Sequence, residues 1–446
     1  MEYTVNTPCG ALRGVLAGEG IVAYKGIRYA TAGRFEYPTE VTAWDGVYDA
    51  TEFGACAYQP RSFYDEEQMP KKIFYYNEFR RGESYRYSED CLFLNVFVPE
   101  ELPSEPMPVI LHIHGGGYTG GCGHEKHFSL PIWPKKGVIA VTINYRLGPL
   151  GFAVLPGLKE REGRAGNYGL YDQLTAISWV RHNIAAFGGD PENITVMGQS
   201  AGAMSVQQLC LSPLSEGMFH KAVMCSGGGV SRMIAVSDAK KHLEFWGMIM
   251  EKCGARSAEE MREIPVEKIF AVWQENKKLS MGGGCSPYID GELIVAKEHK
   301  RLADSAQMKI PYMIGSTSED VVPPFLYSMA KGWCRAQDTP AYRWFFERNL
   351  PGDDHGAWHS SDLWYWFGSL DRCWRPFTER DAELAEEMSD RLCAFAKTGS
   401  PNLDGLAEWP DGGKLAMSFG DEESALRNPS RLKLWYTLFT NEAPGE

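Results

Sequence analysis

Ser200 lies in a segment whose pattern is typical of a catalytic nucleophile. Residues 198–202 fit G-x-S-x-G, residues 194–197 before them predict a short buried strand, and residues 201–208 predict the start of a helix. A strand that turns directly into a helix exposes the residue at its tip, and the flanking glycines let both elements pass closely. The helix N-terminus favours negative charge developing there. Because the chain has 47 glycines, the pattern alone also fits an ordinary turn, so further parts of a hydrolase site are required.

A serine nucleophile needs hydrogen-bond donors for the oxyanion, and a glycine-rich loop can supply them. Gly115, Gly116 and Gly117 follow the predicted strand 108–113 after His114, and these glycines have no side chains to cover the backbone N–H groups. We expect the N–H groups of Gly116, Gly117 and Ala201 to form an oxyanion hole. A phosphate-binding loop is the alternative, but the Gly-Lys-Ser/Thr sequence of such loops does not follow.

The base is expected to be a histidine from the late part of the chain, because folds of this type present serine, acid and histidine in that order. His355 and His359 meet this requirement, whereas His299 precedes the strand expected to carry the acid. His359 is next to an aromatic run and is the better candidate for a buried base. Two adjacent carboxylates, Glu319 and Asp320, follow that strand, and their spacing does not decide between them.

The elements around these residues predict an α/β fold with a mostly parallel central sheet. Strands that are apolar throughout alternate with helices, as in sheets covered on both faces, and ligands bind at the carboxyl ends of such strands. An antiparallel meander within residues 3–30 is expected to open the fold. The further predicted strands are 92–98, 108–113, 138–144, 194–197, 221–225, 311–315 and 432–438, and the predicted helical segments are 171–187, 232–280 and 381–398.

We predict a single domain over residues 1–446, because no internal repeat, low-complexity tract or linker interrupts the chain. Insertions around the mouth of the site are expected at about 53–91, 230–285 and 322–358. The first looks like a long surface excursion without a clear period, and the second is largely helical and amphipathic. The aromatic residues of the last insertion show no pattern that assigns them to a helix or a strand.

Composition excludes several classes of protein. Hydrophobic residues make up 44% of the 446 residues, so a large core can form and disorder is not expected. The formal net charge of −13 argues against nucleic acid and anionic membranes as partners. The paired cations Lys71-Lys72 and Arg80-Arg81 are interpreted as a solvated face. Neither a signal peptide nor a membrane span is recognised in the sequence, so we expect a cytoplasmic protein.

The eleven cysteines show no CxxC pair or other metal-ligand spacing. An odd number of cysteines in a chain of this length suits a reducing compartment, with most thiols buried as small apolar groups. The sequence therefore predicts neither a metal site nor a cofactor.

These residues together resemble the type-B carboxylesterase family of α/β-hydrolases, which includes para-nitrobenzyl esterases, liver carboxylesterases and cholinesterases. The resemblance covers nearly the whole chain and is strongest to the bacterial carboxylesterases. It implies the α/β-hydrolase fold with helical insertions around the active-site mouth, and the hydrolysis of carboxylic esters. The segments that carry it are 25–30, 88–95, 114–118, 144–148, 167–173, 187–191, 198–203, 289–291, 397–402 and 409–410.

The resemblance also implies which residues are the acid and the base. The family's acid is the glutamate of a Gly-x-x-x-(Asp)-Glu-Gly stretch, and this position falls on Asp320. The glycine that usually follows is Val321 here, which keeps Glu319 as the runner-up. The family's histidine opens a stretch like His-x-x-Glu-Leu-Pro-Tyr-x-Phe, and its match in this chain favours His359 over His355.

Other matched residues imply structural contacts rather than chemistry. Two ion pairs are implied by the resemblance, and a loop-closing disulfide of the family is left open for a cytoplasmic protein. The implied ion pairs are Arg34 with Glu89 and Arg146 with Asp172, and the cysteines that match the disulfide are Cys56 and Cys91.

The sequence thus predicts a serine hydrolase that acts through an acyl-enzyme on small apolar or aromatic carboxylic esters. Gln199, Phe325 and Trp364 are expected to line the substrate pocket. Cholinesterases carry a glutamate at the position of Gln199 and a tryptophan where this chain has none near Arg81, which argues against a quaternary ammonium substrate. A catalytically silent binding relative and an amidase with the same triad are the alternatives. The expected partner is a small-molecule ester substrate, neither nucleic acid nor a membrane is expected, and the oligomeric state is not predicted.

Overall fold

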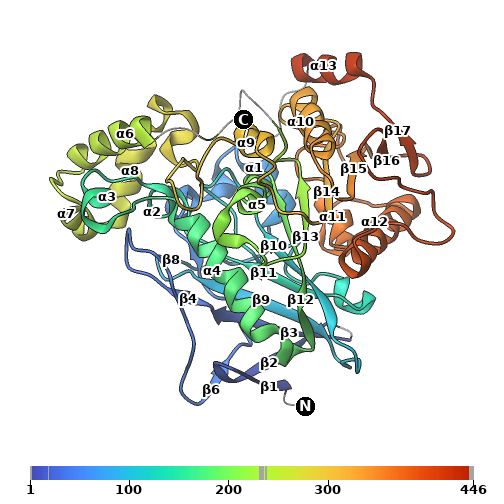
Figure 1. Cartoon of the computed structure of the whole chain (residues 1–446), viewed down its shortest axis with the longest axis horizontal. Helices are drawn as coiled ribbons and strands as arrows, with labels where there is room; N and C mark the ends of the chain where they lie inside the picture. The colour runs from blue at the N-terminus through green and yellow to red at the C-terminus, as the bar shows by residue number, and fades with distance from the viewer. Residues whose placement is uncertain (1–2, 19, 231–235, 237–238, 441–446) are drawn as a thin grey trace.

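A central β-sheet runs through the computed structural model, which describes residues 3–18, 20–230, 236 and 239–440 (Figure 1). The described strands form a 13-stranded sheet in the order β1-β2-β3-β9-β11-β10-β12-β13-β14-β15-β16-β17, with β6 paired to β2. Two small two-stranded sheets lie outside it. Their strands, together with β6, are β4 (Ala30–Thr31), β5 (Thr39–Glu40), β6 (Val47–Asp49), β7 (Cys56–Ala57) and β8 (Tyr87–Ser88).

The N-terminal part of the sheet is antiparallel, which confirms the predicted meander. β1 (Tyr3–Thr7) pairs with β2 (Gly10–Gly18), and β2 pairs with β3 (Ile21–Arg28). β9 (Phe93–Pro99) joins β3 to β11 (Ile139–Ile143), again with antiparallel pairing. The first strands therefore form one edge of the sheet, beside the parallel strands that follow.

From β11 to β16 each pair of neighbouring strands is parallel. Every residue of β11, β13, β14, β15 and β16 is buried, because helices cover both faces of the sheet. This confirms the predicted α/β fold with a mostly parallel sheet. The remaining strands are β10 (Met107–Ile113), β12 (Gly189–Gln199), β13 (Lys221–Cys225), β14 (Tyr312–Thr317), β15 (Ala341–Phe346), β16 (Ala416–Phe419) and the antiparallel edge strand β17 (Ala425–Arg427).

The α-helices of the described chain surround this sheet (Figure 1). They are α1 (Ile73–Phe79), α2 (Gly148–Phe152), α3 (Leu158–Glu162), α4 (Tyr168–Asn183), α5 (Ala201–Leu211), α6 (Ala239–Lys252), α7 (Ala258–Glu263), α8 (Val266–Asn276), α9 (Glu298–Ala303), α10 (Pro323–Arg335), α11 (Leu363–Trp366), α12 (Glu379–Thr398) and α13 (Arg431–Thr440). No helix of the described residues is both long and apolar enough to span a membrane.

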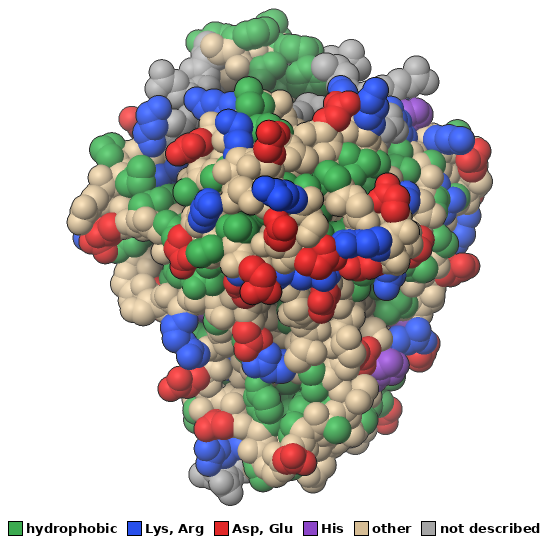
Figure 2. Space-filling view, turned by 90° about the vertical axis from the view of Figure 1, so that its left-hand side faces the viewer, with side chains coloured by type: hydrophobic (Ala, Val, Ile, Leu, Met, Phe, Trp, Pro, Cys, Tyr) green, Lys and Arg blue, Asp and Glu red, His purple; other side chains and the backbone are tan. Residues whose placement is uncertain are grey.

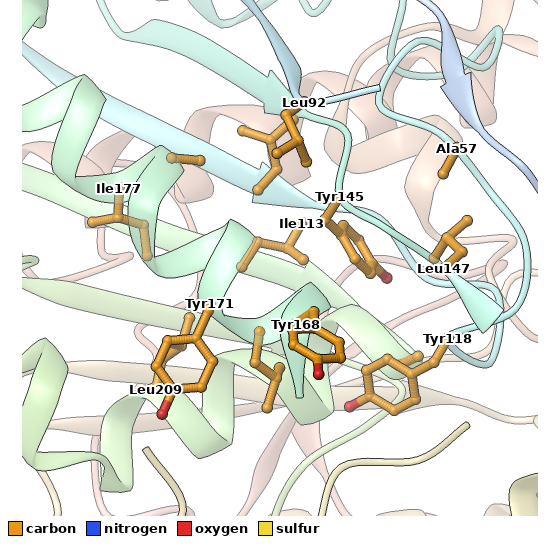
Figure 3. Packing of buried hydrophobic residues seen from close by; sticks show 14 of the residues in the cluster. Ala57, Leu92, Ile113, Tyr118, Tyr145, Leu147, Tyr168, Tyr171, Ile177 and Leu209 are labelled. Atoms are coloured by element: carbon orange, nitrogen blue, oxygen red, sulfur yellow. The ribbon is translucent and has the colours of Figure 1, made fainter. Parts of the chain in front are cut away.

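Two hydrophobic clusters cover the two faces of the sheet, because successive strand residues point to opposite sides. Leu111 and Ile113 of β10 belong to the cluster that includes Ile177 of α4. Figure 3 shows part of this cluster, with Ile113 and Ile177 among its labelled residues. Ile110 of β10 instead belongs to the cluster that includes Met388 of α12. The strand ends that carry the site are therefore held between two packed layers.

The helical character predicted for residues 232–280 is confirmed where the structure describes them. Helices α6, α7 and α8 project at the left of Figure 1. Figure 2, which views the molecule from that side, shows basic and acidic side chains interspersed over the surface. Residues 232–235 and 237–238, which the prediction also covered, lie outside the described residues.

The prediction of a last strand at residues 432–438 is wrong, because this segment lies in helix α13. Leu434 is buried in a cluster with residues of α10 and β15, and the Trp435 ring contacts the Phe325 ring of α10 with centroids 5.7 Å apart. Leu432 and Phe439 are 81% and 80% exposed. A short apolar run fits a strand or a helix equally well, and β17 already occupies the edge of the sheet.

Both implied ion pairs form in the structure. Nη2 of Arg146 lies 2.6 Å from Oδ1 of Asp172, with both side chains buried. The Arg34 Nε atom donates to Oε2 of Glu89 at 2.8 Å. The cysteines that match the family disulfide, in contrast, are free thiols, as are the other nine.

Candidate active site

Ser200 lies at the sharp turn between β12 and α5, with φ 54° and ψ −121°. A positive φ is rare for a residue with a side chain, and the packing around the turn holds it. A Cβ atom on Gly202 would come within 2.0 Å of the Ile113 carbonyl oxygen, and one on Gly198 would come within 2.4 Å of the Gly202 carbonyl carbon. The glycines are therefore required for the close approach of α5 to the sheet. The Ser200 N–H donates to the Cys225 carbonyl at 2.8 Å, which fixes the turn against β13.

The glycine loop after β10 lies beside this turn. A Cβ atom on Gly115 would come within 2.5 Å of Gln199 Oε1 and 3.0 Å of the Ser200 Cβ. Gly116 and Gly117 both have positive φ values, of 106° and 61°. Among the hydrogen bonds of the described residues, none uses the N–H of either Gly116 or Gly117. These donors are thus available at the edge of the cavity that contains Ser200.

The carboxylate of Asp320 holds the ring of His359. Nδ1 of His359 donates to Oδ1 of Asp320 at 2.5 Å. Asp320 follows β14 and is fully buried at its carboxylate. Its other oxygen, Oδ2, accepts from the backbone N–H and the hydroxyl of Thr317 at 3.2 and 3.1 Å. The backbone N–H of Val321 also donates to Oδ1 at 2.9 Å, so the carboxylate orientation is fixed from several sides.

Glu319, the runner-up for the acid, points elsewhere. Its Oε2 atom accepts from the Ala357 N–H at 2.9 Å and from the Ser318 hydroxyl. Glu319 thus braces the loop that precedes the histidine, while its neighbour Asp320 contacts the imidazole. His355, the other late histidine, packs edge-on against Phe74 with ring centroids 4.8 Å apart.

Charge interactions set the protonation of this pair. Burial alone would lower the pKa of His359, but the charge of Asp320 and its hydrogen bond raise that pKa above the ordinary 6.5. Burial would conversely raise the pKa of Asp320, and the imidazolium and the hydrogen bonds to the carboxylate lower it below 3.8. Asp320 is therefore ionised over the pH range in which His359 titrates.

Gln199 contacts the other ring nitrogen of His359, Nε2. The amide nitrogen of Gln199 lies 3.2 Å from Nε2 of His359. An amide nitrogen can only donate, so Nε2 accepts and the ring proton is on Nδ1, facing Asp320. The described structure has no hydrogen bond between the Ser200 hydroxyl and His359, although both residues line the same cavity. Catalytic hydrogen bonds often tighten only when substrate binds.

Asp362 adds a third carboxyl group to this region. Its side chain is fully buried, Oδ2 accepts from the Trp366 indole N–H at 3.2 Å, and Oδ1 has no hydrogen-bond partner. Burial, with a further contribution from the charge of Asp320, raises the pKa of Asp362 to about 7. When it is ionised, its charge adds to the forces that raise the pKa of His359.

The cavity over these residues has a volume of about 560 Å³. Its lining includes Ser200, Gln199 and His359, the glycine loop and a set of apolar side chains. The apolar and aromatic lining residues are Pro60, Tyr64, Met69, Tyr75, Phe79, Phe128 and Leu363.

Two of the residues predicted for the pocket lie outside this lining. Phe325 contacts Trp435 of α13. Trp364 is fully buried and packs against Phe79 and His127, behind the cavity wall. Both were inferred from aromatic runs, which also form ordinary core.

Charged residues also line the cavity. The interpretation of the paired cations as a solvated face is wrong for Arg80, whereas Lys71, Lys72 and Arg81 are exposed. Arg80 is buried and pairs with Glu66 and Glu125. Lys72 is exposed but lines the cavity together with Lys277. The sequence gives no clear signal for these positions, because Lys72 and Arg80 lie at the two ends of the short helix α1 and Lys277 follows the end of α8.

Comparison with known proteins places the chain in a family. The sequence model of the Carboxylesterase family matches residues 1–332. This chain belongs to the carboxylesterase family. The para-nitrobenzyl esterase of Bacillus subtilis (strain 168) is 29% identical to this carboxylesterase over 477 aligned residues, which cover 91% of this chain and 92% of that protein.

Solved structures agree with the assignment. A PNB esterase superposes with a TM-score of 0.83 at 26% identity and covers 99% of this chain and 100% of its own. An esterase from the anaerobe Clostridium hathewayi, described as able to hydrolyze aliphatic aromatic polyesters, has a TM-score of 0.81 at 25% identity, with 98% and 97% of the two chains covered. The carboxylesterase therefore has the α/β-hydrolase fold, and hydrolysis of carboxylic esters is its activity.

Two features of the carboxylesterase site were missed from the sequence. Asp362 belongs to the stretch that identified His359, yet its position matches a family glutamate that was assigned no role. The sequence also assigns no role to Thr317, which donates to Asp320. In both cases the signal is burial beside Asp320 and His359, which arises only when distant segments fold together.

Proposed function

We propose that the carboxylesterase acts through a serine nucleophile and an acyl-enzyme. Ser200 attacks the ester carbonyl, and Nε2 of His359 takes the hydroxyl proton. Asp320 orients the imidazole and stabilises the imidazolium. The N–H groups of Gly116, Gly117 and Ala201 bind the oxyanion of the tetrahedral intermediate. The single observation that carries the proposal is the contact of His359 with Asp320, in the same cavity as a serine on a strained strand–helix turn.

The proton path follows from the tautomer of His359. In the free enzyme Nε2 holds a lone pair and is contacted by Gln199. Substrate binding is proposed to move the Gln199 amide aside so that the Ser200 hydroxyl donates to Nε2. The imidazolium then gives its proton to the leaving alcohol. A water molecule, deprotonated by the same nitrogen, hydrolyses the acyl-enzyme and restores Ser200.

We infer that the substrates are small esters with an apolar or aromatic group. The aromatic and aliphatic side chains Tyr75, Phe79, Phe128 and Leu363 on the cavity wall support this inference. The structural relative from Clostridium hathewayi is described as an esterase of aliphatic aromatic polyesters. Gln199 is uncharged, so the cavity lacks a carboxylate next to the nucleophile to attract a quaternary ammonium group.

The experiment compares wild type and Ser200→Ala on a short p-nitrophenyl ester. We expect kcat of the variant to fall by at least about 10³-fold, because the nucleophile and its base act as one unit. Ser205→Ala, which alters a buried serine one turn further along α5, is the matched control and should retain most of the activity. Equal rates for Ser200→Ala and wild type would overturn the proposal. Rates on a matched anilide separate an esterase from an amidase.

A further inference from the structure

Three potential metal ligands gather outside the residues assigned to ester hydrolysis. They are Cys56 of β7 and, in the loop after the glycine segment, Cys122 and His124. The ligand atoms of the three side chains all lie within 4.8 Å of one another, and all three residues are buried. Sγ of Cys56 is 3.5 Å from Nε2 of His124. Burial of thiols and an imidazole at one point makes this a candidate coordination site.

The spacing of these atoms fits a tetrahedral cation. With zinc–sulfur and zinc–nitrogen bonds of about 2.3 and 2.0–2.1 Å, a tetrahedral angle places sulfur and nitrogen about 3.5 Å apart. This is the separation between Cys56 and His124. Two thiolates and one imidazole are three of the four ligands that such a cation takes, which leaves one position for a further ligand.

The surroundings favour an oriented imidazole. The ring of His124 stacks on Phe53 with centroids 4.6 Å apart and planes 8° from parallel. Its Nδ1 atom is buried without a hydrogen-bond partner. Its Nε2 atom faces Cys56, so a lone pair on this nitrogen is directed at the cluster.

A buried cation lies close to the same thiols. Nη1 of Arg61 donates to Glu125 at 2.8 Å, but Nε and Nη2 of Arg61 are buried without partners. Burial and the neighbouring Cys122 raise the pKa of the Cys56 thiol, and the charge of Arg61 opposes this rise. Thiolates at the cluster would place negative charge beside this guanidinium, which neutral thiols do not.

We propose that Cys56, Cys122 and His124 form a binding site for a thiolate-preferring d10 cation, Zn²⁺ or Cu⁺. As each metal–sulfur bond forms, the S–H bond of that cysteine breaks and its proton passes to solvent. His124 contributes the lone pair of one ring nitrogen and loses no proton. Two thiolates cancel the charge of Zn²⁺, whereas Cu⁺ leaves one negative charge near Arg61.

The site would connect the first insertion to the oxyanion loop. Gln59 exchanges two hydrogen bonds with Gly121, of 3.0 and 3.1 Å. Asn144 accepts from the Gly123 N–H at 2.8 Å and donates to the Ala55 carbonyl at 3.0 Å. These bonds flank Cys122 on one segment and Cys56 on the other. A cation bound between them would tie both segments together without touching Ser200 or His359.

The test uses the full-length carboxylesterase, reduced and stripped of metal with a chelator that is then removed. Zn²⁺ affinity and stoichiometry are measured by competition with a chromophoric chelator, and Co²⁺ is added as a spectroscopic probe of thiolate ligation. A parallel titration with Cu⁺ identifies which cation is preferred. The variants are Cys122→Ser and His124→Gln, and Cys373→Ser is the control, because Cys373 is a partly exposed thiol outside the cluster.

We expect one Zn²⁺ or one Cu⁺ per chain for wild type and for Cys373→Ser, with a sulfur-to-cobalt charge-transfer band. Cys122→Ser should lose this band, and its affinity should fall at least about 100-fold, beyond the 10–100-fold typical of changes next to a metal ligand. His124→Gln should weaken binding while keeping a thiolate band, which provides a second readout if Cys122→Ser does not fold. Wild type that binds neither cation, or Cys122→Ser that binds as tightly as wild type, would overturn the proposal. A disulfide from Cys56 to Cys91 or Cys122 in protein whose thiols are blocked at cell lysis would also overturn it.

Discussion

The contact between Gln199 and His359 should make the proposed base sensitive to the residue that precedes the proposed nucleophile. His359 must be neutral to accept a proton, so kcat/KM should fall as the pH falls through its raised pKa. Gln199→Glu would place a carboxylate near Nε2, which lies 3.2 Å from the present amide. A nearby negative charge favours the imidazolium. We expect the acidic limb of the pH profile to move to higher pH by about one unit, and an unchanged limb or a downward movement would contradict the assignment of His359.

The two adjacent carboxylates can be separated by isosteric substitutions. Asp320→Asn removes the charge that holds Nδ1–H of His359 and allows the wrong tautomer, so kcat should fall by about 10³–10⁴-fold. Glu319→Gln keeps an acceptor for the Ala357 N–H and should change kcat by less than about tenfold. Steady-state kinetics on one ester provide the measurement. A large loss confined to Glu319→Gln would contradict the role of Asp320.

Asp362 should make the stability of wild type depend on pH. Its folded-state pKa of about 7 lies above the ordinary 3.8. As the pH rises, Asp362 therefore loses its proton at a lower pH in the unfolded chain than in the folded protein. Folding stability from this group is therefore lost as pH rises from about 4 to 7. Asp362→Asn mimics the neutral form of the side chain. The free energy of unfolding of this variant, relative to that of wild type, should increase by on the order of 2 kcal/mol from pH 5 to pH 8. Denaturant unfolding at both pH values tests this, and a difference between the proteins that is independent of pH would contradict it.

At the scale of elements, two separate segments each bring a lysine to the lining of the cavity. Lys72 immediately precedes α1 and Lys277 follows α8, and both line the cavity. Burial and the charge of Lys72 lower the pKa of Lys277. Among the described residues, neither lysine has a carboxylate within ion-pair distance. The mouth thus presents positive charge on a molecule whose formal net charge is −13.

This arrangement predicts a preference between matched esters. An ester whose far end carries a carboxylate should lose about two- to fivefold in kcat/KM with Lys277→Gln, while its neutral analogue should change little. Lys268→Gln, on the exposed side of α8, makes the same change in net charge and is the control. The loss should shrink at high salt. Equal effects of both substitutions on both esters would show that Lys277 does not contact the substrate.

At the scale of the whole molecule, periodicity and composition predicted the parallel core well. Strands such as β13 are continuous apolar runs bounded by polar turns, so local sequence is sufficient to locate them. The prediction was incomplete where local signals are ambiguous. β15 lies within an aromatic segment whose sequence does not distinguish a helix from a strand. The apolar run of α13 also fits either element, and only its packing on α10 identifies it as a helix.

The residues of the candidate site could be predicted where they follow a recognisable strand or belong to a matched sequence motif. Ser200, the glycine loop, Asp320 and His359 occupy strand ends or matched motifs, and the structure brings Asp320 onto His359. Neither the charged residues that line the cavity nor the cluster of Cys56, Cys122 and His124 could be predicted. Cys56 and Cys122 are distant in sequence, and only the path of the first insertion brings them together.

Trapping the acyl-enzyme tests the central claim most directly. Wild type is mixed with a p-nitrophenyl ester whose acyl group is slow to hydrolyse, quenched in acid, and analysed by intact mass and peptide mapping. We expect a mass increase equal to one acyl group, located on the peptide that contains Ser200, and no adduct on Ser200→Ala. Turnover of the ester without any adduct, or an adduct on a different residue, would contradict the account.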